Sequence, residues 1–116
     1  MKVLQVDFQD ANASIDFARS LKDTGFAVIK NHPIDYKLVM DVFAEWQSFF
    51  NSEYKNNYHF NNDTQDGFFP MSVSETAVGY SVKDIKEFFH YYPWGQYPSE
   101  LSDKSKLLYA QMQNIA

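Results

Sequence analysis

The length, composition and charge of the chain exclude several classes of protein. With 116 residues, of which 45% are hydrophobic and 22% charged, the chain is large enough for one globular domain and too small for two. A net charge of −5 without any basic cluster argues against nucleic-acid binding. The absence of cysteine excludes disulfides and thiolate metal sites. We find no signal peptide and no apolar run of about 18 residues, so we expect a soluble cytoplasmic protein without a membrane partner.

Residues 1–35 predict a strand, a helix and a second strand. Residues 3–8 alternate between apolar and polar, as in a half-buried strand. Asn12 or Ser14 can cap the helix, and Gly25 can end it because glycine tolerates positive φ. Residues 26–29 are a short apolar run that predicts a buried strand. The helix carries an apolar stripe formed by Ile15, Ala18 and Leu21.

A second helix is predicted from about Asp35 to Asn51. Its apolar positions recur at helical spacing and are rich in aromatic residues, so we expect it to be a main packing element. This stripe consists of Leu38, Val42, Trp46 and Phe49, with Val39, Phe43 and Phe50 beside it. The asparagines at 56–57 and 61–62 predict an exposed loop after this helix.

The last part of the chain predicts extended segments and a final helix. Turns are expected at 67–70 and 79–80, and a strand is expected at 88–92. The final helix, about 102–116, has apolar positions at Leu107, Leu108, Met112 and Ile115. Because no capping glycine or polar tail follows, we expect residues 1–116 to be a single domain that is truncated within this helix.

The three histidines do not form a recognisable iron site. A facial non-haem iron site takes two histidines and one carboxylate, usually with one histidine two residues before the carboxylate. None of His32, His59 and His90 has an acidic residue at that spacing. We therefore interpret each histidine as a structural or surface residue.

Other catalytic patterns are also missing from the sequence. Neither a phosphate-binding glycine motif nor a Gly-x-Ser-x-Gly nucleophile elbow occurs. Two of the three residues Glu75, Asp84 and Glu87 could form an acid/base pair, but we interpret them as solvent-exposed carboxylates because nothing in the sequence indicates burial. The residue chemistry alone thus indicates an aromatic-rich domain without a site.

Five blocks, in order, resemble the N-terminal region of isopenicillin N synthase-like, Fe(II)/2-oxoglutarate-dependent oxygenases. The blocks are Val6-Asp7, Gly25 to His32, Phe49-Phe50 followed by Lys55, Gly67 to Pro70, and Asp84 to Phe89. Two positions depart from the family pattern. Pro33 stands where the family usually has glycine, and Phe68 replaces the usual tyrosine.

The resemblance implies a fold and a role. In this family a double-stranded β-helix that follows the N-terminal region carries the iron ligands, a His-x-Asp pair and a distant histidine, and an Arg-x-Ser motif that binds 2-oxoglutarate. None of these motifs occurs in the sequence. The resemblance therefore implies an α+β (or α/β) fold with two to three helices and a small sheet, lacking its β-helix core. The chain alone would be non-catalytic and would bind no cofactor, whereas its parent would be an oxidoreductase that uses Fe(II) and 2-oxoglutarate.

Two other expectations concern the surface of the chain. The resemblance implies that some side chains line the substrate pocket of the parent, and the candidates are Phe68, Phe69, Glu75 and Tyr80. An alternative is a free-standing, aromatic-rich binding or self-association domain, because aromatic residues make up 18% of the chain and would leave apolar surface exposed without the β-helix. The expected partner is then either the missing β-helix domain or a second copy in a homo-oligomer. A complete enzyme is the least favoured alternative.

Overall fold

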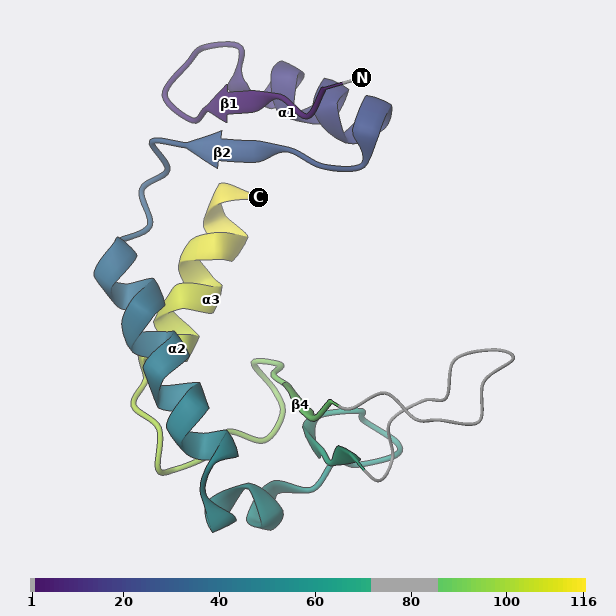
Figure 1. Cartoon of the computed structure of the whole chain (residues 1–116), viewed down its shortest axis with the longest axis vertical. Helices are drawn as coiled ribbons and strands as arrows, with labels where there is room; N and C mark the ends of the chain where they lie inside the picture. Colours follow the sequence, from purple (N-terminus) through teal and green to yellow (C-terminus); the bar gives the residue numbers. More distant parts are fainter. Residues whose placement is uncertain (1, 72–85) are drawn as a thin grey trace. The chain divides into compact units, whose positions relative to one another are not determined.

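The computed structural model describes residues 2–71 and 86–116. The chain divides into two compact units, residues 1–35 and 36–116, and each is described by itself. Within the described ranges the fold contains three α-helices, one 3-10 helix and two sheets of two strands each (Figure 1). This arrangement confirms the predicted α+β class, with two small sheets in place of one. No helix in the described part is long and apolar enough to cross a membrane.

The first unit is a strand–helix–strand motif. Strands β1 (Gln5–Asp7) and β2 (Val28–Lys30) pair in parallel, with Val6 opposite Ile29. Parallel neighbours need a crossover connection, and helix α1 (Ala13–Thr24) provides it. Gly25 ends α1 with φ of 80°, and its N–H donates to the carbonyl of Leu21, as the sequence predicts.

Buried Ser20 of α1 forms hydrogen bonds with the segment before β1 and with the segment before β2. The Leu4 N–H donates to Ser20 Oγ at 3.0 Å, and the Ser20 hydroxyl donates to the Phe26 carbonyl at 2.6 Å. The face of α1 that meets the sheet is therefore partly polar. The predicted apolar stripe lies on the outside instead: Ile15, Ala18 and Leu21 are all exposed.

The prediction that residues 26–29 form a buried strand is wrong. Phe26 is 70% exposed, and Val28 is exposed as well. The reason is that α1 covers only one face of a two-stranded sheet. Ile29 shares that face with buried Val6, whereas Val28 shares the opposite face with exposed Gln5.

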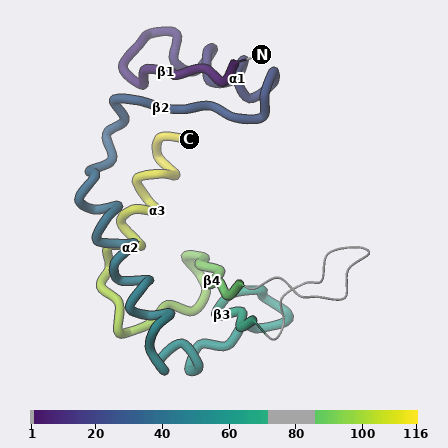
Figure 2. Tube along the Cα trace, viewed as in Figure 1, coloured from purple at the N-terminus to yellow at the C-terminus, as the bar shows by residue number. Residues whose placement is uncertain are grey.

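The second unit begins with α2 and ends with α3. Its elements are α2 (Tyr36–Phe50), the 3-10 helix η1 (Glu53–Tyr58), β3 (Gly67–Phe69), β4 (Phe88–His90) and α3 (Lys104–Ile115). Strands β3 and β4 pair antiparallel, with Phe68 opposite Phe89 (Figure 2). Helix α3 packs along α2 (Figure 1). The predicted loop at 56–57 is wrong because these residues lie in η1, and residues 67–69 form a strand where a turn is expected.

An aromatic cluster forms the core of the second unit. Phe49 of α2 lies at its centre, with ring centroids 5.3 Å from Trp46, 5.7 Å from Phe89 and 6.5 Å from Phe68, all in edge-to-face geometry. Edge-to-face contacts add to the area that the rings bury. The predicted inward stripe of α2 is thereby confirmed, except that Phe43 is 67% exposed.

Candidate functional site

The predicted pocket-lining residues fall into two groups. Glu75 and Tyr80 lie outside the described residues. Phe68 is 1% exposed and packs between the rings of Phe49 and Phe50, inside the aromatic core. Phe69 points to the opposite face of the β3–β4 pair, as alternation along a strand requires. The role of all four residues in a substrate pocket stays a prediction.

A stack of aromatic rings covers the second face of the β3–β4 pair. Phe69 stacks on Phe60 at 4.4 Å and on Phe88 at 4.8 Å, with the ring planes within 12° of parallel. His90 lies beside this stack, 4.6 Å from the Phe69 ring, and its Nδ1 lies 3.0 Å from the Gln65 carbonyl oxygen. These contacts fix the position of the His90 imidazole beside the aromatic stack.

The histidines do not converge with acidic residues. His32 and His59 are exposed, and His90 belongs to the aromatic stack. Over residues 2–71 and 86–116, no three side chains from histidine, cysteine, aspartate and glutamate lie close enough together to hold a metal ion. The described residues therefore do not fit an iron site.

Glu87, which we predicted to be a solvent-exposed carboxylate, forms a partly buried ion pair with Lys55. Glu87 is 24% exposed, and the Lys55 ammonium, 23% exposed, donates to both of its oxygens at 3.1 and 3.2 Å. Lys55 also donates to the Phe50 carbonyl at 2.9 Å, near the end of α2. The prediction of a solvent-exposed Glu87 is wrong because Lys55, 32 residues earlier, joins the end of α2 to the start of β4. Glu75 and Asp84 lie outside the described residues.

Asp66 is a buried carboxylate that sequence reasoning missed. It accepts hydrogen bonds from the Thr64 hydroxyl and, at 2.7 Å, from the Gln96 N–H. These two donors, with the Thr64 hydroxyl contributing most, hold the pKa of Asp66 below its usual value. Asp66 directly precedes strand β3, but no local pattern pairs it with a residue 30 positions later. Its chemistry is structural, since both oxygens are used to hold loops.

We expect the acid sensitivity of the fold to depend on Asp66. A carboxyl whose folded-state pKa is lowered stabilises the protein at pH values above its unfolded pKa of about 3.9, and this stabilisation is lost as the pH falls through the folded pKa. Asp66→Asn should therefore flatten the fall in the free energy of unfolding below about pH 5 in urea titrations. Thr64→Val, which removes one of the donors, should flatten it partly. An unchanged slope in Asp66→Asn would contradict this role.

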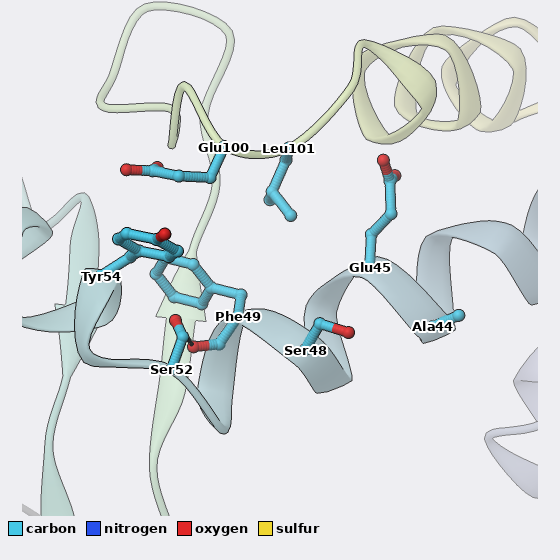
Figure 3. Close-up of a pocket in the computed structure, with 8 residues that line it drawn as sticks. All are labelled: Ala44, Glu45, Ser48, Phe49, Ser52, Tyr54, Glu100 and Leu101. Atoms are coloured by element: carbon cyan, nitrogen blue, oxygen red, sulfur yellow. Dashed lines mark hydrogen bonds between the residues drawn. The ribbon is translucent and has the colours of Figure 1, made fainter.

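A pocket of about 330 Å³ lies between the second half of α2 and the segment before α3 (Figure 3). One oxygen of Glu45 accepts the Ser102 N–H at 2.9 Å, and Glu100 accepts the Tyr58 hydroxyl at 2.7 Å. The second Glu45 oxygen is shielded from solvent and has no hydrogen-bond partner among the residues that the structure describes. Figure 3 shows Leu101 between the two carboxylates, so they do not face one another across a reaction centre.

A wider groove of about 430 Å³ runs between α2, β4 and α3, and we call it the α2–α3 groove. Its wall is almost entirely apolar and aromatic. The lining residues are Val42, Trp46, Phe50, Glu87, Phe88, Phe89, Tyr91, Ser105, Leu108, Tyr109 and Met112. The Trp46 Nε1–H donates to Ser105 Oγ at 2.7 Å and so ties α2 to α3 at the groove. Such a surface suits the packing of another apolar segment.

Comparison with known proteins identifies the family. The family described as "non-haem dioxygenase in morphine synthesis N-terminal" matches residues 5–114. The chain belongs to this family. A solved structure of a protein from Shewanella oneidensis, provisionally named an oxygenase, is 44% identical to this dioxygenase N-terminal chain and superposes with a TM-score of 0.82. The match covers 99% of this chain and 39% of the Shewanella chain, so this chain spans about two fifths of its length. No curated protein matches.

Membership of the dioxygenase N-terminal family is consistent with the absence of a metal-binding cluster among the described residues. The family is defined by an N-terminal region, and the match includes both units of the chain. The side chains that the structure brings together stabilise the fold. They are the aromatic core, the Lys55–Glu87 ion pair, and Asp66 with its hydrogen-bond donors Thr64 and Gln96. The predicted family is confirmed, and two of the blocks that carry the resemblance meet at the Lys55–Glu87 pair.

Proposed function

We propose that this chain is the N-terminal supporting part of a non-haem Fe(II) oxygenase that uses 2-oxoglutarate, and that the chain alone does not catalyse the reaction. The observation that carries the proposal is the family match over residues 5–114. The Shewanella protein supports it, because the match occupies only 39% of that longer chain. The iron and 2-oxoglutarate ligands are then supplied by another part of the parent.

The role of the chain in such an oxygenase is to provide a rigid wall. Phe68 and Phe89 attach the β3–β4 pair to α2, and the Lys55–Glu87 pair fixes the start of β4. The second face of the pair then presents the stack of Phe60, Phe69 and Phe88. Flat aromatic walls are typical of small-molecule pockets, which are largely apolar and preformed. Phe69 is 9% exposed and stacks on both Phe60 and Phe88, so these two half-buried rings come before Phe69 as candidates for a contact with substrate.

The proposal is tested by comparing the chain with a longer protein that contains it. Under anaerobic conditions with 2-oxoglutarate present, we expect calorimetric Fe(II) titration to show no stoichiometric binding to the 116-residue chain and one site in the longer protein. In air, the longer protein should form succinate from 2-oxoglutarate in an iron-dependent reaction. Stoichiometric Fe(II) binding by the short chain would contradict the supporting role. A longer protein without a His-x-Asp pair and second histidine would contradict the oxygenase.

A second candidate function is self-association. A second apolar stripe on α2, at positions i, i+4 and i+7, is exposed and consists of Tyr36, Met40 and Phe43. A helix that is apolar on more than one face is usually buried on each of them. Light scattering over a range of concentrations tests this candidate, since a strictly monomeric chain would not use this stripe for a homo-oligomer.

A further inference from the structure

We infer that the α2–α3 groove is the surface on which the rest of the oxygenase docks, and that the docking segment is apolar and uncharged. This inference rests on the proposed function and assigns it a place on the molecule. The groove is lined by Trp46 and Phe50 of α2 and by Phe89 of β4. Leu108 and Met112 of α3 also line it, and Met112 is 54% exposed.

Two polar side chains of the groove, Glu87 and Ser105, already have partners within the chain. Glu87 is its one charged lining residue among the described residues, and both of its oxygens accept hydrogen bonds from Lys55. Ser105 Oγ accepts the hydrogen bond from Trp46. A charged side chain inserted here would lose its hydration without gaining a counter-ion, which is costly. An apolar segment would instead bury the exposed parts of the aromatic wall and of Met112.

The match to the Shewanella protein favours the rest of the oxygenase, and not a second copy of this chain, as the partner that covers the α2–α3 groove. The Shewanella chain contains the counterpart of 99% of this chain within 39% of its own length, and the two superpose with a TM-score of 0.82. The same fold therefore occurs in a protein with more than half of its chain elsewhere. A segment tethered to the groove competes at a high effective concentration, whereas a second copy must bind from solution.

The absence of cysteine from the chain allows a direct test by thiol labelling. Met112→Cys places a unique thiol in the groove, whereas Asn114→Cys places one at an exposed position two residues along α3, about 200° away around the helix. Both variants are made in the 116-residue chain and in the longer protein, in which other cysteines are replaced by serine. The rate of reaction with Ellman's reagent is measured for each.

We expect the Met112→Cys thiol to react about tenfold or more slowly in the longer protein than in the short chain, because labelling of a covered site requires local opening. The Asn114→Cys thiol should react at similar rates in both. Tyr109→Cys provides a second groove position if the first variant does not fold.

Two results would overturn the inference. One is an equal rate for the groove thiols in both proteins. The other is protection in the short chain that grows with its concentration, which would assign the groove to a second copy. Failure of the proposed function is detected separately, since succinate formation does not depend on how the groove thiols react.

Discussion

Replacement of Phe68 by alanine is expected to lower the free energy of unfolding of the second unit by about 3–5 kcal/mol. Phe68 is 1% exposed and contacts Phe49, Phe50 and the Lys55 ammonium, which lies 5.6 Å from its ring centroid. The substitution removes a large ring from a close-packed core and leaves a cavity that the neighbouring strand and helix fill only partly. Urea titration followed by circular dichroism and by the fluorescence of Trp46 and Trp94 measures this loss.

The matched control for this substitution is Phe43→Ala. Phe43 also lies in the second unit, but it is 67% exposed, so its removal should change the free energy of unfolding by less than about 0.5 kcal/mol. Because a small domain is stable by only about 5–15 kcal/mol, the loss in Phe68→Ala is a large share of the stability of the second unit and should lower its urea midpoint clearly. Equal losses for the two variants would show that Phe68 does not belong to the core.

Gly67→Ala is the second substitution with a large expected effect, about 2–4 kcal/mol of lost stability. Gly67 has a φ of 108°, which side chains rarely tolerate. A Cβ built there would lie 2.7 Å from the Tyr58 carbonyl oxygen and 2.6 Å from Gln96 Nε2. The Tyr58 carbonyl belongs to the backbone, so the chain itself would have to shift, and β3 begins at this residue.

Gly25→Ala separates the cost of a positive φ from the cost of a steric clash at the new Cβ. Gly25 also has a positive φ, of 80°, but a Cβ there would meet no atom within 4 Å. Its substitution should cost about 1–2 kcal/mol from backbone conformation alone. Native-state hydrogen exchange measures each unit separately and so allows the two glycines to be compared. If both substitutions cost the same, the contact of Gly67 with the Tyr58 carbonyl is not a source of strain.

Much of the fold could be predicted from local patterns. The apolar period of α2, the Gly25 cap and the alternation around β1 depend on neighbouring residues, which a single sequence displays. Local patterns did not predict which face of α1 packs against the sheet. Its apolar stripe is a true helical stripe, but Ser20 occupies the side that meets the sheet.

The missed features of the site share one cause. Lys55 and Glu87 are 32 residues apart, and Asp66 and Gln96 are 30 apart, so no local spacing joins either pair. The 3-10 helix η1 was missed because its asparagines are typical of loops. By contrast, the family was recognised correctly from the order of the blocks, which depends on sequence identity and not on contacts.

The parallel pairing of β1 and β2 has a consequence for synthesis of the chain. A hairpin strand meets its partner as soon as the turn is complete, but β1 ends at Asp7 and its partner begins only at Val28. The ribosome must therefore release the whole of α1 before β1 can make its ladder, and closing that loop carries an entropic cost. During this interval Val6, which is later buried, stays in water. In the folded chain the Leu4 N–H donates to Ser20 of α1, and this hydrogen bond involves only residues that precede β2.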